Sequence, residues 1–371
     1  MTSLYHRLPR DHPRFAHWRL PVSGIIAVAG YLAASVVLIG VVIAGFEIAG
    51  EGDRIDEWMD TLELSGLDDP IFLGVDLGGI AILLPVVLLA LLATGRHQAG
   101  LLLSVEGRMR WRWLALTSVL AFAVVAGVFL ASVLVLPVDV VGARPDVRLP
   151  DGTMVVGLVV VLLLVPFQAA AEEVVCRGYL LQLIGSWIPK VWLGAIVGGV
   201  VGTALFVLGH AYELWGQVDV GLFGVVCVVL TLRTGGLEAA IALHAANNIV
   251  LFAFDGFAVW PDVTSGDADG PLYVLPTVVI ALIFIGLVEL AAARGGLARR
   301  REWPVLPPPR PRPAWGPGWG PAPYPHLAPA RVSAPPQVPA TVGAPPAGSL
   351  RPEVSPEAPP YPGELPEGWN R

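Results

Sequence analysis

The chain has 371 residues, of which 55% are hydrophobic and only 14% are charged. A soluble domain usually carries about 25% charged residues, so this composition indicates a membrane protein. The net charge of −7 is spread over the chain without a basic block, and we expect no nucleic-acid partner. Cys176 and Cys227 lie in apolar stretches and are predicted to be buried thiols rather than a disulfide.

The first 22 residues form a short basic segment that precedes a long apolar stretch. Arg7, Arg10, Arg14 and Arg19 come before the apolar residues 24–49. That stretch has about the ~20 residues needed to cross a bilayer, whereas a signal peptide has an apolar core of only ~7–15 residues. We therefore predict a first span that anchors the chain.

Eight apolar stretches are long enough to cross a membrane. They are residues 24–49, 71–94, 113–137, 154–185, 191–210, 218–233, 236–254 and 272–293. The sixth is the shortest, and the fourth is too long for a single crossing. We predict an all-α, polytopic transmembrane helical bundle of about eight spans, in contact with membrane lipid.

The charges between these stretches predict the topology. Basic residues lie before the first span, between the second and third, at the fourth-to-fifth and sixth-to-seventh turns, and after the eighth. The intervening connections are mainly acidic. By the positive-inside rule both termini are cytoplasmic, and we expect the plasma membrane as the location.

The end of the chain has a different composition, because 22 of the 35 prolines lie from Pro304 onward. Such a density of proline prevents helix and sheet and predicts an extended, disordered tail. Within it, the sequence WGPGWGPAPYP, which contains Trp315 and Trp319, would fit a proline-reading partner domain. A solvated tail of low complexity is the simpler interpretation.

Ionisable residues interrupt the fourth apolar stretch, in the sequence AAAEEVVCRGYLLQ. Glu172, Glu173 and Arg177 are expensive to place in hydrocarbon, so an intramembrane cluster of this kind indicates a functional site. Glu173 and Arg177 are four residues apart and can pair on one helix face. Glu172, about 100° away around the helix, is then free to face the interior of the bundle.

Further polar residues occur in two later spans. The fifth ends with Phe206 and His210 in FVLGH, and the seventh carries His244 and Asn248 four residues apart. Asn247 points about 100° away from that face. Lipid offers these groups no partner, so we expect them to converge on one another or on water.

Several chemistries fit such a cluster. Glutamate and histidine can activate a water molecule, while histidine and asparagine can donate hydrogen bonds to an oxyanion. Alternatively His210, His244 and a glutamate such as Glu172 could hold a divalent metal such as zinc. Water-mediated hydrolysis of an amide bond matches best, and proton-coupled transport is the main rival.

The three motifs together resemble those of the CPBP intramembrane proteases, a family that includes the type II CAAX prenyl proteases and the Abi proteins. They are Glu172-Glu173-x-x-x-Arg177, Phe206-x-x-x-His210 and His244-x-x-x-Asn248, in that order, and the resemblance covers residues 155–255. It implies an intramembrane endopeptidase, of the metalloendopeptidase type, that cuts a membrane-associated peptide or protein.

The resemblance also implies a role for each motif residue. Glu172 would activate water together with His210, and Glu173 would be the second motif carboxylate, steadied by Arg177. His244 and Asn248 would stabilise the oxyanion, and Phe206 would support the site. On helical rise alone, Glu172 and His210 differ in depth by roughly 6 Å, so we expect a tilted or broken helix to bring them level.

The sequence therefore divides into five segments. These are a cytoplasmic segment at 1–22, three spans at 23–152, a CPBP-like catalytic core at 153–255, the last span and its basic end at 256–301, and the proline-rich tail at 302–371. Two alternatives share the same helices: a catalytically silent scaffold or immunity factor, and a proton-coupled transporter. The inverted repeats or broken helix pairs that favour a transporter are missing from the sequence.

Overall fold

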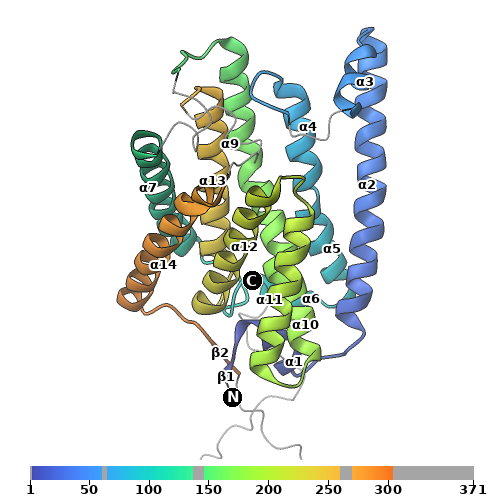
Figure 1. Cartoon of the computed structure of the whole chain (residues 1–371). Coiled ribbons are helices and arrows are strands. Elements are labelled where there is room, and N and C mark those ends of the chain that lie inside the picture. Colours follow the sequence, from blue (N-terminus) through green and yellow to red (C-terminus); the bar gives the residue numbers. More distant parts are fainter. Residues whose placement is uncertain (1, 61–64, 137–145, 260–269, 304–371) are drawn as a thin grey trace, which may run out of the picture. The chain divides into compact units, whose positions relative to one another are not determined.

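The computed structural model describes residues 2–60, 65–136, 146–259 and 270–303, and in this part of the chain it is a helical bundle (Figure 1). The described elements include only one pair of two-residue strands. The prediction of an all-α, polytopic bundle is thus confirmed. The predicted disordered tail lies outside the described residues from position 304 onward.

The helical elements are η1 (Tyr5–Arg7), α1 (Leu8–Asp11), α2 (Arg19–Ala49), α3 (Asp53–Asp60), α4 (Pro70–Ala81), α5 (Leu83–Thr94), α6 (Arg96–Leu103), α7 (Trp111–Val135), α9 (Gly152–Glu173), η2 (Val174–Leu180), α10 (Leu181–Trp187), α11 (Val191–Leu208), α12 (Leu214–Thr234), α13 (Glu238–Gly256), η3 (Pro271–Val274) and α14 (Leu275–Gly295). The strands are β1 (Thr2–Ser3) and β2 (Arg301–Glu302), which pair antiparallel.

Eight helical segments among the described residues are long and apolar enough to span a membrane, and each overlaps one predicted stretch. The chain is therefore an integral, multi-pass membrane protein. The sixth segment begins at Leu214 rather than at 218, because the residues up to the polar Gln217 already belong to helix α12 instead of forming a loop.

Exposed tryptophans mark one end of the bundle. Trp18 precedes α2, Trp111 opens α7, Trp187 closes α10 and Trp192 lies at the start of α11, and all four are exposed. Arginine and lysine are their close neighbours in the sequence. Tryptophan is enriched where a membrane meets water, so we call this end the basic end and take it as one interface level.

The fourth predicted stretch is a continuous but irregular helix of 36 residues from Gly152 to Trp187. Asp151 caps its start by accepting a hydrogen bond from the amide of Met154 at 2.8 Å. Pro166 lies inside α9, and η2 that follows α9 is wound as a π-helix. Proline and π-turns are the usual causes of helix bending, and these two irregularities lie on either side of the motif glutamates.

The N-terminal segment is folded against the basic end, which its composition alone did not reveal. Arg7 donates hydrogen bonds to the carbonyls of Gly185 and Ile188, at 2.8 and 2.7 Å, where α10 ends. Cationic side chains favour a helix C-terminus because its carbonyls lack partners. The segment predicted at 1–22 is thus part of the folded unit, and α2 begins within it at Arg19.

The boundary of the predicted tail also differs from the structure. Glu302 belongs to β2 and pairs with Thr2, and the indole of Trp303 donates a hydrogen bond to the Ser3 hydroxyl at 2.7 Å. The prediction that the tail begins at 302 was therefore wrong for Glu302 and Trp303. Strand pairing with the first residues of the chain overrides the local composition there.

Helix α13 lies at the centre of the bundle and packs against α7, α9 and α12 (Figure 1). Every residue from Glu238 to Ala246 is buried. Its start is held by Arg110, whose guanidinium contacts both carboxylate oxygens of Glu238 at 2.7 and 2.8 Å. This buried ion pair fixes the position of the helix that carries His244 and Asn248.

Candidate active site

Helices α9 and α13 bring most of the candidate residues together. His244 contacts Glu172, whereas Asn248, one turn further along α13, contacts Gln168, one turn earlier on α9. The helices are therefore antiparallel, and residues four apart on each form matching rungs. We call Gln168, Glu172, Glu173, His244 and Asn248 the polar ladder.

The lower rung places His244 between the two glutamates. Its Nδ1 lies 2.9 Å from Oε1 of Glu173, and its Nε2 lies 3.3 Å from Oε2 of Glu172. Glu173 is completely buried, whereas 17% of the Glu172 side chain is exposed. Glu172 is therefore the carboxylate that water can reach, and Glu173 fixes the imidazole from behind.

The predicted pair of Glu173 and Arg177 is present. The guanidinium Nη1 lies 2.9 Å from Oε1 of Glu173, and both side chains are completely buried. The guanidinium carbon also lies 4.3 Å from the centre of the Phe206 ring, a cation–π contact. Arg177 thus compensates the buried charge of Glu173 and connects it to α11.

The upper rung adds a residue that the sequence interpretation missed. The amide nitrogen of Asn248 donates a hydrogen bond to Oε1 of Gln168 at 3.2 Å, and Gln168 is buried. Its position four residues before Glu172 is the signal that would have found it, because that spacing puts both on one helix face. Gln168 thus sets the orientation of the Asn248 amide.

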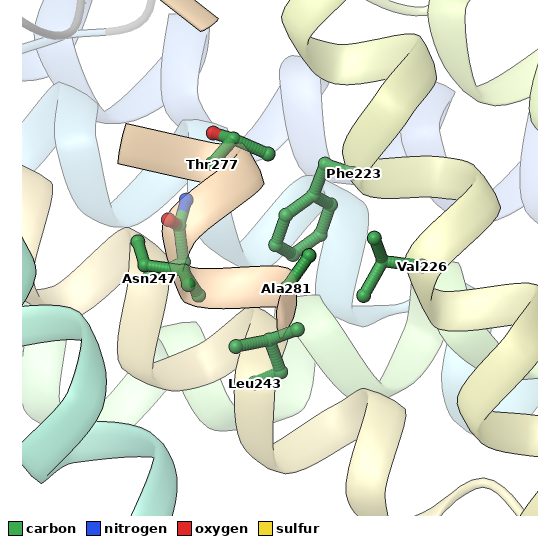
Figure 2. A pocket seen from close by; sticks show the side chains of 7 residues that line it. Phe223, Val226, Leu243, Asn247, Thr277 and Ala281 are labelled. Atoms are coloured by element: carbon green, nitrogen blue, oxygen red, sulfur yellow. The ribbon is translucent and has the colours of Figure 1, made fainter. Parts of the chain in front are cut away.

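Asn247 faces away from the ladder, as its position on the helix predicts. It lines a small pocket together with Phe223 on α12 and Thr277 on α14, and Figure 2 shows its amide on the same side of this pocket as the Thr277 hydroxyl. Its link to the ladder is a long contact of 3.4 Å to Oδ1 of Asn248.

A row of glycines brings α11 close to the ladder. Gly194, Gly198 and Gly202 are four residues apart, and a Cβ at Gly202 would lie 2.5 Å from the carbonyl oxygen of Cys176 on η2. Small residues at this spacing let helix backbones approach closely in membranes. Phe206, four residues further, is then placed with its ring perpendicular to that of His244, at 5.5 Å.

His210 lies just beyond the end of α11, on the same side. Its Nδ1 is 2.7 Å from the carbonyl oxygen of Phe206, and its ring contacts the rings of Phe206 and Tyr212. Among the described residues, no hydrogen bond or ion pair joins His210 to Glu172. The structure therefore gives Glu172 a different histidine partner, His244, from the one that we predicted.

The three candidate metal ligands, His210, His244 and Glu172, lie near one another but are turned to different partners. The described residues contain no group of three or more His, Cys, Asp and Glu side chains that is placed to hold a metal ion. Glu172 and His244 face each other, and His210 directs Nδ1 to a backbone carbonyl. The three candidates therefore do not form a ligand set in this arrangement.

Comparisons with known proteins agree with the position of the ladder. The family model of Type II CAAX prenyl endopeptidase Rce1-like matches residues 153–250, which contain all three motifs. A curated relative, the uncharacterized protein YyaK of Bacillus subtilis (strain 168), is 37% identical over 100 residues. That alignment covers 26% of this chain and 33% of YyaK, so the chain spans about a third of its relative. No solved structure matches the chain significantly.

The matched segment begins with α9 and ends in α13, so it contains every residue of the polar ladder together with Arg177, Phe206 and His210. The first three spans and the last span lie outside it. By its motifs, their geometry and this match, the segment of residues 153–250 is similar to the Rce1-like type II CAAX prenyl endopeptidases.

Proposed function

We propose that this protein is an intramembrane endopeptidase that hydrolyses a peptide bond of a membrane-associated protein or peptide. The observation that carries the proposal is the position of His244 between Glu172 and Glu173, one turn from Asn248. The match of this segment to a protease family supports it.

The lower rung is arranged for the transfer of one proton. His244 lies between the two carboxylates, with Nδ1 2.9 Å from Glu173 and Nε2 3.3 Å from Glu172, and Arg177 pairs with Glu173. His244 and Glu172 can therefore share a proton, which is the requirement for general acid–base catalysis.

The proposed reaction uses this proton-sharing pair. Glu172 takes a proton from a water molecule while the water oxygen attacks the carbonyl carbon of the peptide. The carbonyl oxygen becomes an oxyanion, to which the Asn248 amide donates a hydrogen bond. When the carbon–nitrogen bond breaks, Glu172 returns the proton to the leaving amine. Water is consumed, and a carboxylic acid and an amine are formed.

Other residues have supporting roles in this proposal. Glu173 and Arg177 hold the imidazole of His244, and Phe206 packs on both Arg177 and His244. His210 borders the same site, and its Nδ1 is occupied by the Phe206 carbonyl. We further propose cytoplasmic termini and a plasma-membrane location, from the charges of the loops. A proline-reading partner of the tail stays a prediction.

The proposal is tested with protein purified in detergent. A library of internally quenched peptides, with a prenylated CAAX peptide as one member, is incubated with wild-type protein with and without a chelator. Cleavage by wild type and its loss in Glu172→Gln are the expected results. The matched control is Glu289→Gln, which removes a carboxylate paired with Arg233 and Arg299. Its cleavage rate should equal that of wild type.

Two outcomes contradict the proposal. If Glu172→Gln cleaves as fast as wild type, Glu172 is not the base. If no peptide is cleaved by folded wild-type protein in either condition, the silent scaffold gains support. If wild-type protein cleaves without the chelator but not with it, the reaction depends on a metal.

A further inference from the structure

The burial of three helices changes at the level of the polar ladder. In α13 every residue from Glu238 to Ala246 is buried, and Asn247 and Asn248 are partly exposed. In α12 the only residue buried before Phe223 is Gly216. In all three helices, α9 included, the more buried half is the one toward the basic end. The ladder therefore lies at the edge of a buried layer, formed by the halves of α9, α12 and α13 toward the basic end, which we call the closed layer.

The closed layer is built from segments far apart in the sequence. Gln182 of α10 donates a hydrogen bond to the carbonyl of Leu101 at 2.8 Å, and Tyr5 of the N-terminal segment bonds the carbonyl of Leu102. Arg110 and Glu238 form their buried pair on the same side of the ladder. Together they close the route from the basic end to His244.

The other side of the ladder is bordered by a polar turn. Residues 209–213 connect α11 to α12, and Glu213 and Gln217 are exposed. Phe206 lies at the level of His244, whereas α13 continues for 12 residues beyond His244 to Gly256. At about 1.5 Å per residue, α13 rises about 18 Å beyond His244, whereas the chain rises only about 6 Å from Phe206 to His210 in the turn. The turn thus ends roughly 12 Å short of the end of α13. Figure 1 shows the connection of α11 and α12 well below the upper ends of α9 and α13.

Exposed polar groups at this depth require water, because hydrocarbon offers them no partner. We therefore propose that water and substrate reach the polar ladder over the α11–α12 turn, from the end opposite β1 and β2. With cytoplasmic termini, the cleaved segment is then a peptide presented on the extracytoplasmic side of the membrane. The identity of this substrate class rests on the proposed function, whereas the opening itself does not.

Cysteine labelling tests the opening without any need for proteolysis. Both native cysteines are buried, and a Cys176→Ala, Cys227→Ala background removes them. A membrane-impermeant sulfonated maleimide is applied to intact cells and to permeabilised cells. Glu213→Cys on the turn should be labelled in intact cells. Lys190→Cys, exposed at the basic end, should be labelled only after permeabilisation.

A second pair of variants locates the closed layer in purified protein. Asn247→Cys lies at the level of the ladder, between His244 and Asn248, and Ala240→Cys lies two turns toward the basic end on the same face of the helix. In detergent, Ala240→Cys should react at least ~10-fold more slowly than Asn247→Cys, since it becomes accessible only through local opening. Circular dichroism and thermal unfolding confirm that each variant is folded.

Each result has a distinct meaning. Equal reactivity of Ala240→Cys and Asn247→Cys would overturn the closed layer. Labelling of Lys190→Cys but not Glu213→Cys in intact cells would overturn the extracytoplasmic entry. If wild type cleaves no peptide while the labelling pattern is as expected, the proposed function fails and the opening stands.

Discussion

The upper rung of the ladder provides a sharp test of the catalytic assignment through Gln168→Met. Methionine has nearly the same length and shape but cannot accept the hydrogen bond that Asn248 donates at 3.2 Å. A bond between neutral groups contributes about 0.5–1.5 kcal/mol, so the loss of stability should be small. The loss of rate should be larger, because an oxyanion donor is worth ~10²–10³ in kcat and Gln168 fixes its orientation. We expect kcat to fall by about 10–100-fold with little change in KM.

A double-mutant cycle separates positioning from general damage. If Gln168 acts only through Asn248, then Gln168→Met should cost nothing further in an Asn248→Ala background. The matched control is Gln182→Met, which removes another buried glutamine hydrogen bond, to Leu101, away from the ladder. It should lower the melting temperature in detergent with kcat near wild type. Additive losses in the cycle, or an equal loss of kcat in Gln182→Met, would refute the reasoning.

Three further predictions concern stability, measured as thermal unfolding in detergent. Arg177→Ala leaves the carboxylate of Glu173 buried without its cation and should cost about 3–5 kcal/mol; an unchanged melting temperature would contradict the buried ion pair. Gly202→Ala forces a backbone apart and should cost about 1–3 kcal/mol, whereas Gly286→Ala, with open space around its Cβ, should cost nothing. Burial and a stacked histidine lower the pKa of His12 to about 4, so the unfolded chain takes up a proton first and stability should fall as the pH drops below about 6.5. His12→Phe should flatten that dependence, and an unchanged slope would show that another group causes it.

The membrane spans could be predicted from the sequence because hydrocarbon imposes a simple requirement on them. A stretch of about 20 apolar residues is needed to cross, and each predicted stretch corresponds to one helical segment. The N-terminal segment was less accessible to this reasoning. Its arginines indicated an interfacial charge, but their partners are backbone carbonyls at the end of α10, about 180 residues away in sequence.

In the candidate site, contacts within one helix could be predicted from the sequence, whereas contacts between helices could not. Spacing within one helix predicted the pair of Glu173 and Arg177, since i and i+4 share a face in any helix. It could not predict how helices far apart in the sequence meet, and Glu172 faces His244 on α13 instead of His210, which lies beyond the end of α11. The sequence interpretation did not include Gln168, because a neutral amide in an apolar helix lacks the charge that marked the glutamates. Its spacing of four residues from Glu172 would have indicated it.

The π-helical segment η2 has a consequence for the length of this chain. A π-turn holds one residue more than an α-turn, so Val174–Leu180 acts as a phase shift between two helical halves. Ahead of it, the helix directs Gln168 and Glu172 toward α13; behind it, the helix directs Tyr179 to the Leu20 carbonyl and Gln182 to the Leu101 carbonyl. Winding the same number of residues as a regular α-helix would rotate everything behind the segment by about 100°. One set of contacts would then be lost, so the wide turn is what lets this number of residues serve both sets.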